Sequence, residues 1–198
     1  MTAEALPAEH TIQWPVPPEQ GYTVDDLFTL PGLPPHTELI DGSLVFVSPQ
    51  RVFHSLVMYL LEAGLRRTAP PEVRVRREMT VVIDKRQGPE PDLLVVSAEA
   101  EADTGQTHYR AEDVSLAVEV VSPDSEARDR LRKPQLYAKG GIEHFWRVEQ
   151  GEDGLPVAYV YERDPATGEY ALTGIHRNRL KLAVPFPVDI DLTELERL

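Results

Sequence analysis

One carboxylate lies at the centre of an almost wholly apolar stretch, Leu116-Ala-Val-Glu-Val-Val-Ser-Pro-Asp-Ser125. Its β-branched residues and the Ser-Pro turn after them predict a short buried strand that contains Glu119. Alternation along a strand places Glu119 on the same face as Ala117 and Val121. An ionised carboxylate in such a strand costs several kcal/mol unless something pairs with it, so the fold has to supply a partner.

A second acidic residue begins another strand of the buried type. Asp92 follows the sequence Pro-Glu-Pro and runs directly into the apolar residues 93–96. Two carboxylates on adjacent core strands favour a divalent cation, because hard oxygen ligands suit Mg²⁺ or Mn²⁺. Downstream, Lys133 lies in a segment whose helix can return it to the same place.

Five features follow one another along the chain, and their order is more specific than any one of them. They are Glu-Leu-Ile-Asp-Gly (38–42), Pro-Asp-Leu-Leu-Val-Val (91–96), Val-Glu-Val-Val-Ser-Pro (118–123), the spacing of Asp129, Lys133 and Tyr137, and Gly-Ile-Glu-His-Phe-Trp (141–146). This ordered set resembles the Uma2 family, also called DUF820, over roughly residues 20–185. That family belongs to the PD-(D/E)XK nuclease-like superfamily and is described as restriction endonucleases.

The resemblance implies an endonuclease that hydrolyses the phosphodiester bonds of nucleic acid with Mg²⁺ or Mn²⁺. Asp92 and Glu119 would be the side-chain ligands of the metal, and the carbonyl of Val120 could complete its shell. Glu38 matches an acidic residue of the family that binds a second metal directly or through water. One or two such ions can supply an activated water, a Lewis acid on the phosphoryl oxygens and stabilisation of the leaving oxyanion.

The catalytic lysine of this superfamily is missing from its usual place. In the plain Glu-x-Lys form it stands two residues after the glutamate, where this chain has Val121. The resemblance implies a lysine from the next helix, and Lys133 has the matching place; it would position or deprotonate the water, or offset developing charge. Pro134 disfavours the α conformation at Lys133, so we expect the helix to kink or restart there, which leaves the aim of the lysine open.

Three further residues are interpreted as supporting the site. His54 falls on or beside the apolar stripe of a long helix, where the family often has a histidine. We interpret it as a satisfied core or edge histidine in preference to a metal ligand. Asp129 and Tyr137 lie at i and i+8 of the helix that carries Lys133, and they could hold this lysine and the sheet edge in place.

Each candidate also has a purely structural explanation. Asp92 could simply start a strand after a Pro-x-Pro turn, Glu119 could be neutralised by an arginine, and Lys133 could be one more solvated charge. A catalytically inactive member of the same fold, which binds nucleic acid or protein, is therefore the alternative function. A glycosidase with paired carboxylates would give Lys133 no role.

The charge of the chain counts against DNA binding without excluding it. The chain has 20 Lys and Arg against 33 Asp and Glu, a net charge of −13, whereas phosphate contacts dominate affinity for DNA. Basic residues do cluster, and the clusters are either a basic rim beside an acidic metal site or solvated faces. The clusters are Arg66 with Arg67, Arg74 with Arg76 and Arg77, and Arg128 with Arg130, Arg132 and Lys133. The resemblance implies nucleic acid, DNA in particular, as the partner, and analogy with the superfamily suggests a homodimer.

The order of elements predicts an α/β fold, one mixed sheet flanked by helices, which is the restriction endonuclease-like fold. Periodicity and turn signals place helices at 23–30, 51–67 and 125–139, hairpins at 38–47 and 157–173, strands at 72–78, 79–83, 93–96 and 144–148 besides the Glu119 strand, and a helical turn within 185–198. We expect the polar residues 97–113 to form a loop over an edge of the site. Residues 1–20 read as a loosely ordered arm and residues 21–198 as a single domain.

Composition places the chain among ordinary soluble proteins, with 41% apolar and 27% charged residues. It has no cysteine, so thiolate metal sites and disulfides are excluded, which fits a cytoplasmic protein. No apolar run is long enough to span a membrane, and residues 1–10 lack the pattern of a secretory signal.

Overall fold

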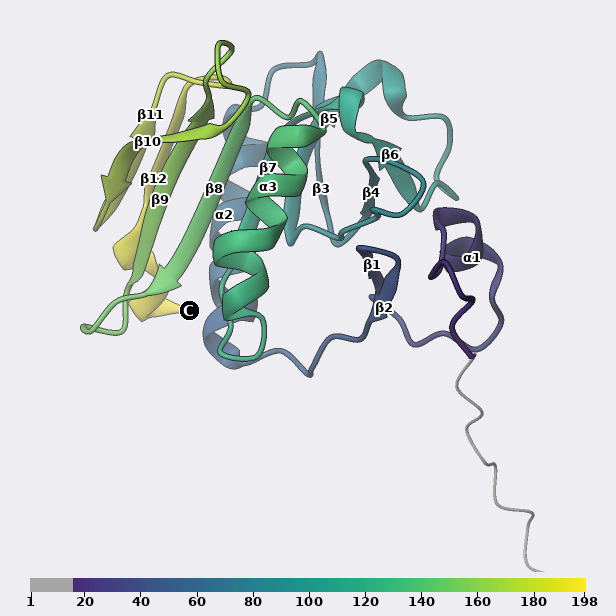
Figure 1. The fold of residues 1–198 in the computed structure, drawn as a ribbon. Helices are drawn as coiled ribbons and strands as arrows, with labels where there is room; N and C mark the ends of the chain where they lie inside the picture. Colours follow the sequence, from purple (N-terminus) through teal and green to yellow (C-terminus); the bar gives the residue numbers. More distant parts are fainter. Residues whose placement is uncertain (1–15) are drawn as a thin grey trace, which may run out of the picture.

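The computed structural model describes residues 16–198, and its centre is a mixed sheet of six strands in the order β10-β9-β8-β7-β5-β3 (Figure 1). The strands are β3 (Val73–Arg77), β5 (Leu93–Ser97), β7 (Val114–Val120), β8 (His144–Gln150), β9 (Pro156–Arg163) and β10 (Tyr170–His176). β7 and β8 run parallel, and the other neighbouring strands are antiparallel. The predicted α/β class, a mixed sheet flanked by helices, is confirmed. Of the arm expected at residues 1–20, residues 1–15 lie outside the described part.

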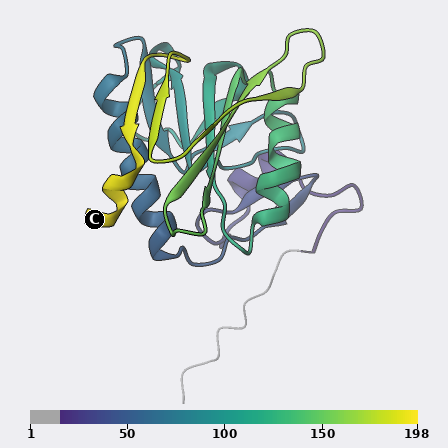
Figure 2. The same cartoon turned by 90° about the vertical axis from the view of Figure 1, so that its left-hand side faces the viewer.

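Apolar side chains cover both faces of the sheet, and strand alternation decides which face each residue joins. Val118 and Trp146 belong to the larger core on one face, and Ala117 and Phe145 belong to a second core on the other. The coverings are α2 (Val52–Thr68), β11 (Arg179–Leu182), β12 (Val188–Asp191) and the 3₁₀-helix η4 (Leu192–Arg197) on the first face, and α3 (Lys133–Lys139) on the second. Figure 2 shows α2 and α3 on opposite sides of the sheet. The even spacing from Ala117 directs Glu119 toward the α3 face.

Smaller elements lie beyond the β3 end of the sheet. A hairpin of β1 (Glu38–Ile40) and β2 (Ser43–Val45) turns at Asp41 and Gly42, both with positive φ, as the Asp-Gly signal predicts. The others are α1 (Val24–Thr29), β4 (Thr80–Val82), β6 (His108–Arg110) and the 3₁₀-helices η1 (Ala98–Ala100) and η2 (Ala111–Asp113). None of the helices within residues 16–198 has the length and apolar character needed to cross a membrane.

The segment before α3 contains a π-helical turn, η3 (Arg128–Arg132). The backbone N–H of Lys133 donates to the carbonyl of Arg128, five residues back, and Pro134 follows at the start of α3. Proline has no N–H, and its ring clashes with the carbonyl four residues before it. A wider turn relieves that clash, so the irregularity expected at Pro134 takes the form of a π turn inside one continuous helical segment.

Two expectations about local structure are wrong. Residues 97–113 are not a plain loop over the site: β6 pairs in parallel with β4, η1 and η2 flank it, and none of these residues lines the cavity described below. Residues 185–198 contain more than a helical turn, because β12 pairs with β11 before η4 begins. The alternating burial of Val188, Ile190 and Leu192 against α2 accounts for that strand.

Candidate active site

The end of β7 and the start of β5 lie side by side, because the two strands are antiparallel and Leu93 pairs with Val118. Asp92 just before β5 therefore comes close to Glu119 and Val120. One carboxylate oxygen of Asp92, Oδ2, accepts the backbone N–H of Val120 at 2.6 Å. Both carboxylates line the same cavity, so the structure brings these two predicted residues together.

Glu119 is only 1% exposed, and both of its carboxylate oxygens have donors. Oε2 lies 3.0 Å from Nζ of Lys133, and Oε1 accepts the hydroxyl of Tyr137 at 2.5 Å. Burial raises the pKa of Glu119 well above its usual value, and the carboxylates of Asp129 and Asp92 raise it further while Lys133 opposes them. Burial also raises the pKa of Tyr137, with the neighbouring Glu119 adding to the effect.

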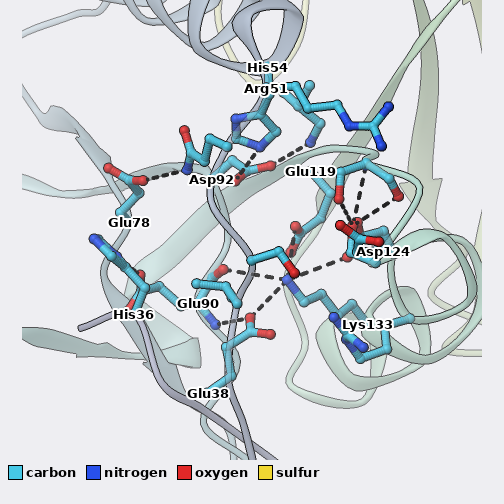
Figure 3. A pocket seen from close by; sticks show the side chains of 18 of the residues that line it. His36, Glu38, Arg51, His54, Glu78, Glu90, Asp92, Glu119, Asp124 and Lys133 are labelled. Carbon is cyan, nitrogen blue, oxygen red and sulfur yellow. Dashed lines mark hydrogen bonds and ion pairs between the residues drawn. The ribbon is translucent and has the colours of Figure 1, made fainter. Parts of the chain in front are cut away.

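Lys133 points into the protein and is 5% exposed. Its ammonium lies 2.8 Å from Oε1 of Glu38 and 3.5 Å from Oδ1 of Asp129, besides the contact with Glu119 (Figure 3). Burial alone would lower the pKa of Lys133, but the carboxylates of Glu119, Glu38 and Asp129 raise it well above its usual value. The lysine is therefore held as an ammonium ion. The sequence left the direction of its side chain open because of Pro134, and in the structure the side chain points toward Glu119.

Asp129 precedes Lys133 by four residues in the helical segment and is 2% exposed. Its Oδ2 accepts the hydroxyl of Ser125, whereas its Oδ1 is buried without a hydrogen bond from any of the described residues. Burial raises the pKa of Asp129, although Lys133 acts against this shift. Glu38, on β1, is also buried, and its Oε1 accepts the backbone N–H of Glu90 at 2.8 Å.

His54 reaches the site from α2. Its Nε2 lies 3.0 Å from Oδ1 of Asp92, and its Nδ1 is buried without a hydrogen-bond partner within residues 16–198. Burial lowers the pKa of His54, but the hydrogen bond to Asp92 and the negative charges of Asp92, Glu78 and Asp129 together outweigh it, so the pKa is raised. The proton therefore belongs on Nε2, and Asp92 is fixed between this N–H and the backbone of Val120.

Several residues at the site were not predicted from the sequence. Glu90 is half-buried between Glu38 and His36, and Nδ1 of His36 lies 2.6 Å from Oε1 of Glu90. Burial raises the pKa of Glu90 while His36 opposes the shift. The Pro-Glu-Pro-Asp motif contains Glu90, so its place beside Asp92 was a signal that the sequence offered. Arg51, Glu78 and Asp124 also line the cavity, and no local pattern marks them. Arg128 lines it too, and the sequence offered only its membership of a basic cluster.

The cavity that these side chains line has a volume of about 80 Å³. This is room for a few water molecules, and it is far below the roughly 300 Å³ at the lower end of pockets that enclose a small-molecule ligand. Seven carboxylates and three permanently charged cations line it, so negative charge is in excess. The seven are Glu38, Glu78, Glu90, Asp92, Glu119, Asp124 and Asp129. A small cation with its water suits such a space better than an organic ligand.

The side chains are of the chemical type that binds a divalent cation, but they are not arranged around a single point as ligands. Within residues 16–198 no three His, Asp or Glu side chains converge as a ready-made metal site. Mg²⁺, however, is commonly held by one or two carboxylates and keeps several waters. The buried Oδ1 of Asp129 without a hydrogen bond, and the surplus of carboxylates around Lys133, are the features that a hard cation would relieve.

The family model for Uma2, described as “Putative restriction endonuclease”, matches residues 24–194. The chain belongs to the Uma2 family. Among solved structures, the Uma2 chain is similar to a crystal structure of a “putative nuclease belonging to DUF820” from Anabaena variabilis ATCC 29413, with a TM-score of 0.68 and 16% sequence identity. That similarity covers 87% of this chain and 96% of the other, and at this identity it concerns the fold, which is the predicted one. No curated protein matches the Uma2 chain significantly.

Proposed function

We propose that this Uma2 protein is a metal-dependent endonuclease that hydrolyses phosphodiester bonds in DNA. The observation that carries the proposal is the buried ammonium of Lys133, 3.0 Å from Glu119 at the inner end of a cavity rich in carboxylates. A structural ion pair normally balances its charges, since an uncompensated buried charge is costly. Here Glu38, Glu119 and Asp129 surround one ammonium, and this imbalance supports a site built for a further cation.

Asp92 and Glu119 would be the side-chain ligands of Mg²⁺ or Mn²⁺, with the carbonyl of Val120 beside them and Glu38 near a second ion. A bound ion would supply Lewis acidity toward the phosphoryl oxygens and a water of lowered pKa. The hydrogen bonds of Asp92 to His54 and to the backbone of Val120 fix the direction of its carboxylate. Partners of this kind orient a ligand before any metal arrives.

Lys133 would act as a fixed positive charge in this mechanism. Because the surrounding carboxylates raise its pKa, it remains protonated and is poorly suited to remove a proton from water. A charged donor held in a site of low dielectric can instead stabilise the negative charge that develops on the phosphoryl group. Glu38 and Asp129 hold the ammonium from two sides, and Tyr137 holds the carboxylate of Glu119.

A catalytically inactive binding module is the second candidate, and two observations favour it. Both oxygens of Glu119 are already occupied by Lys133 and Tyr137, so binding a metal requires one of these contacts to loosen. The net charge of −13 also weakens any attraction to DNA. A binding module would bind an oligonucleotide or protein with no cleavage in any metal.

Cleavage assays separate the two candidates. Supercoiled plasmid, single-stranded DNA and RNA would be incubated with the native chain in Mg²⁺, in Mn²⁺ and in chelator. We expect metal-dependent cleavage of DNA, with loss of that cleavage in Asp92→Asn and Glu119→Gln. Glu152→Gln makes the same change of charge at an exposed position outside the cavity and serves as the matched control.

Metal affinity provides an independent measurement. Calorimetric titration with Mn²⁺ should show binding to the native chain and to Glu152→Gln, and none to Glu119→Gln. If the native chain neither binds Mn²⁺ nor cleaves any of the three substrates, the proposed function is wrong and the binding module is favoured.

A further inference from the structure

Two arginines at the mouth of the cavity have no partner for their charge among residues 16–198. Arg51 is the N-cap residue of α2 and Arg128 begins the π turn, and both line the cavity. Neither side chain makes an ion pair or a hydrogen bond with any other residue of 16–198. In Figure 3 the guanidinium of Arg51 lies at the edge of the site, with no dashed line to a carboxylate.

Most of the other arginines of the basic clusters are neutralised within the protein, and Arg67 donates to the backbone carbonyl of Asp189. Arg130 pairs with Glu126 and Glu149, and Arg132 pairs with Asp41 on the β1–β2 turn. Elsewhere, Arg66 and Arg77 share Glu62, and Arg74 and Arg76 share Glu101. Most of the positive charge that the sequence concentrates therefore serves internal ion pairs. Arg128 faces the cavity and is the member of its cluster that has no acidic partner in the described part of the chain.

Arg128 shows a second sign of an absent partner. The Nε atom of this half-buried side chain is buried and has no acceptor within the described residues. A guanidinium nitrogen removed from water without a hydrogen bond loses free energy on folding. An acceptor brought by a ligand would recover it.

The cations in the inner part of the cavity and at its mouth therefore differ in whether they are paired, although the exposed Asp124 also lines the cavity. Inside, the carboxylates dominate and Lys133 is already held by Glu38 and Glu119. At the mouth, Arg51 and Arg128 are the permanent cations free to meet an anion. A guanidinium presents a planar fork that matches two oxygens of a phosphate. The cavity itself, about 80 Å³, is too small for a nucleotide to enter, so a strand would lie across the mouth.

We propose that Arg51 and Arg128 form a phosphate clamp that holds the backbone of a DNA strand across the cavity, next to the bond to be cleaved. This inference rests on the proposed nuclease function and deepens it. The clamp contacts phosphates and no bases, so it positions the strand without reading its sequence. It also accounts for how a chain with a charge of −13 can bind a polyanion, since the needed cations are concentrated at the point of contact.

The test measures binding of a fluorescent oligonucleotide whose phosphorothioate linkages resist hydrolysis, in Mg²⁺ and over a series of salt concentrations. The variants are Arg51→Gln, Arg128→Gln and the double variant. Arg177→Gln is the matched control, because Arg177 is exposed, lies outside the cavity and makes no ion pair within residues 16–198. Thermal unfolding should be unchanged in all of them, because none of these side chains holds another part of the chain.

We expect each glutamine at the clamp to weaken binding about tenfold, the size of one lost charge-assisted contact, and Arg177→Gln to leave binding unchanged. The slope of log affinity against log salt should become shallower by about 0.7 per arginine for single strands and about 0.9 for duplexes. Replacing both arginines by lysine should restore most of the slope, because the charge is retained. An excess of inorganic phosphate should displace the strand only weakly, because it offers one anion to a clamp for two contacts.

Native affinity and native salt slope in the double glutamine variant would overturn the clamp while leaving the nuclease proposal intact, provided that the native chain cleaves DNA. Equal losses in Arg177→Gln would also overturn it, since they would show a general charge effect. If inorganic phosphate displaces the strand at comparable concentration, the two arginines hold a free anion and the clamp is wrong. Failure of the native chain to bind or cleave any nucleic acid would remove both proposals together.

Discussion

The ammonium of Lys133 and the carboxylate of Glu119 lie 3.0 Å apart, although 14 residues separate them in the chain. The strand that carries Glu119 ends at Val120, and the chain turns through Ser122–Ser125 before the helix brings Lys133 back. Both side chains are buried, so neither charge is shielded by solvent. The pair is the structural reason for expecting chemistry here, and it makes the consequences of removing either partner unequal.

Removing the lysine should be severe. Lys133→Met keeps the aliphatic stem but leaves Glu38, Glu119 and Asp129 without a cation, so we expect a loss of roughly 3–5 kcal/mol in unfolding free energy at neutral pH. Turnover should fall about 10²-fold or more, because the transition state loses its fixed positive charge. Urea unfolding and plasmid cleavage measure the two effects. Lys139→Met, on the same helix with an exposed ion pair to Asp84, is the control and should change each by little. Cleavage at the native rate in Lys133→Met would refute the role of the lysine.

Removing the glutamate charge should be mild for the fold. Glu119→Gln keeps an acceptor for Lys133 or Tyr137, and Lys133 still has Glu38 and Asp129. The substitution takes one negative charge from a site that has too many, so the melting temperature in chelator should rise or stay nearly constant. Calorimetry or circular dichroism would measure this. A drop of several kcal/mol would instead identify Glu119 as half of a structural ion pair.

Stability without metal should fall as pH rises. Burial raises the pKa of Glu119, Asp129 and Glu90, so the folded chain holds more protons than the unfolded chain once the pH exceeds the usual carboxyl value, 4.5 for glutamate and 3.8 for aspartate. Stability from these groups is present below that value and is lost as pH climbs toward the raised pKa values. Melting temperatures in chelator should therefore decline from about pH 5 upward. Added Mg²⁺ should flatten the decline, because a bound cation replaces the protons. A melting temperature that rises over this window would contradict the assignment.

His54 should act by positioning Asp92. His54→Ala removes the donor on Oδ1 of Asp92 and leaves only the N–H of Val120 on the other oxygen. We expect Mn²⁺ affinity to fall about 10-fold or more, the usual effect of losing a partner of a ligand. His54→Gln retains a side-chain N–H and should restore part of the affinity, which a purely packing role would not predict. Equal affinity in all three proteins would show that Asp92 needs no such support.

Local patterns were enough to find β5 and β7, together with Asp92 just before the first and Glu119 within the second. Glu119 and Asp92 stand out because each interrupts or precedes an apolar run, and a buried charge in such a run is rare. The three helices and both hairpins begin and end within a few residues of their predicted positions, because caps, turns and periodicity are local signals.

Contacts between distant segments were beyond reach of those patterns. The parallel pairing of β4 with β6 and the addition of β12 to β11 depend on tertiary packing, and they account for the two wrong expectations. The partners of Glu90 come from β1 and from the segment before it, which no spacing in the sequence relates to residue 90. The single domain over 21–198, the homodimer and the cytoplasmic location stay predictions.

The π turn also sets the rotational phase of the helical segment. Residues four apart in an α-helix drift by about 40° around the axis, so Asp129, Lys133 and Tyr137 would spiral steadily away from one line. A π turn has more residues per turn, so a four-residue step within it drifts in the opposite direction. The step from Asp129 to Lys133 lies in the π turn and the step to Tyr137 lies in α3, and the two drifts offset each other. Deleting one residue of the π turn ahead of Lys133 would restore a regular helix. It would also rotate the ammonium of the lysine by about 100° around the helix axis, away from Glu119. The direction of the Lys133 side chain therefore depends on the number of residues in the π turn. A chain with one residue fewer there would lose the contact between Lys133 and Glu119, even with every charged group retained.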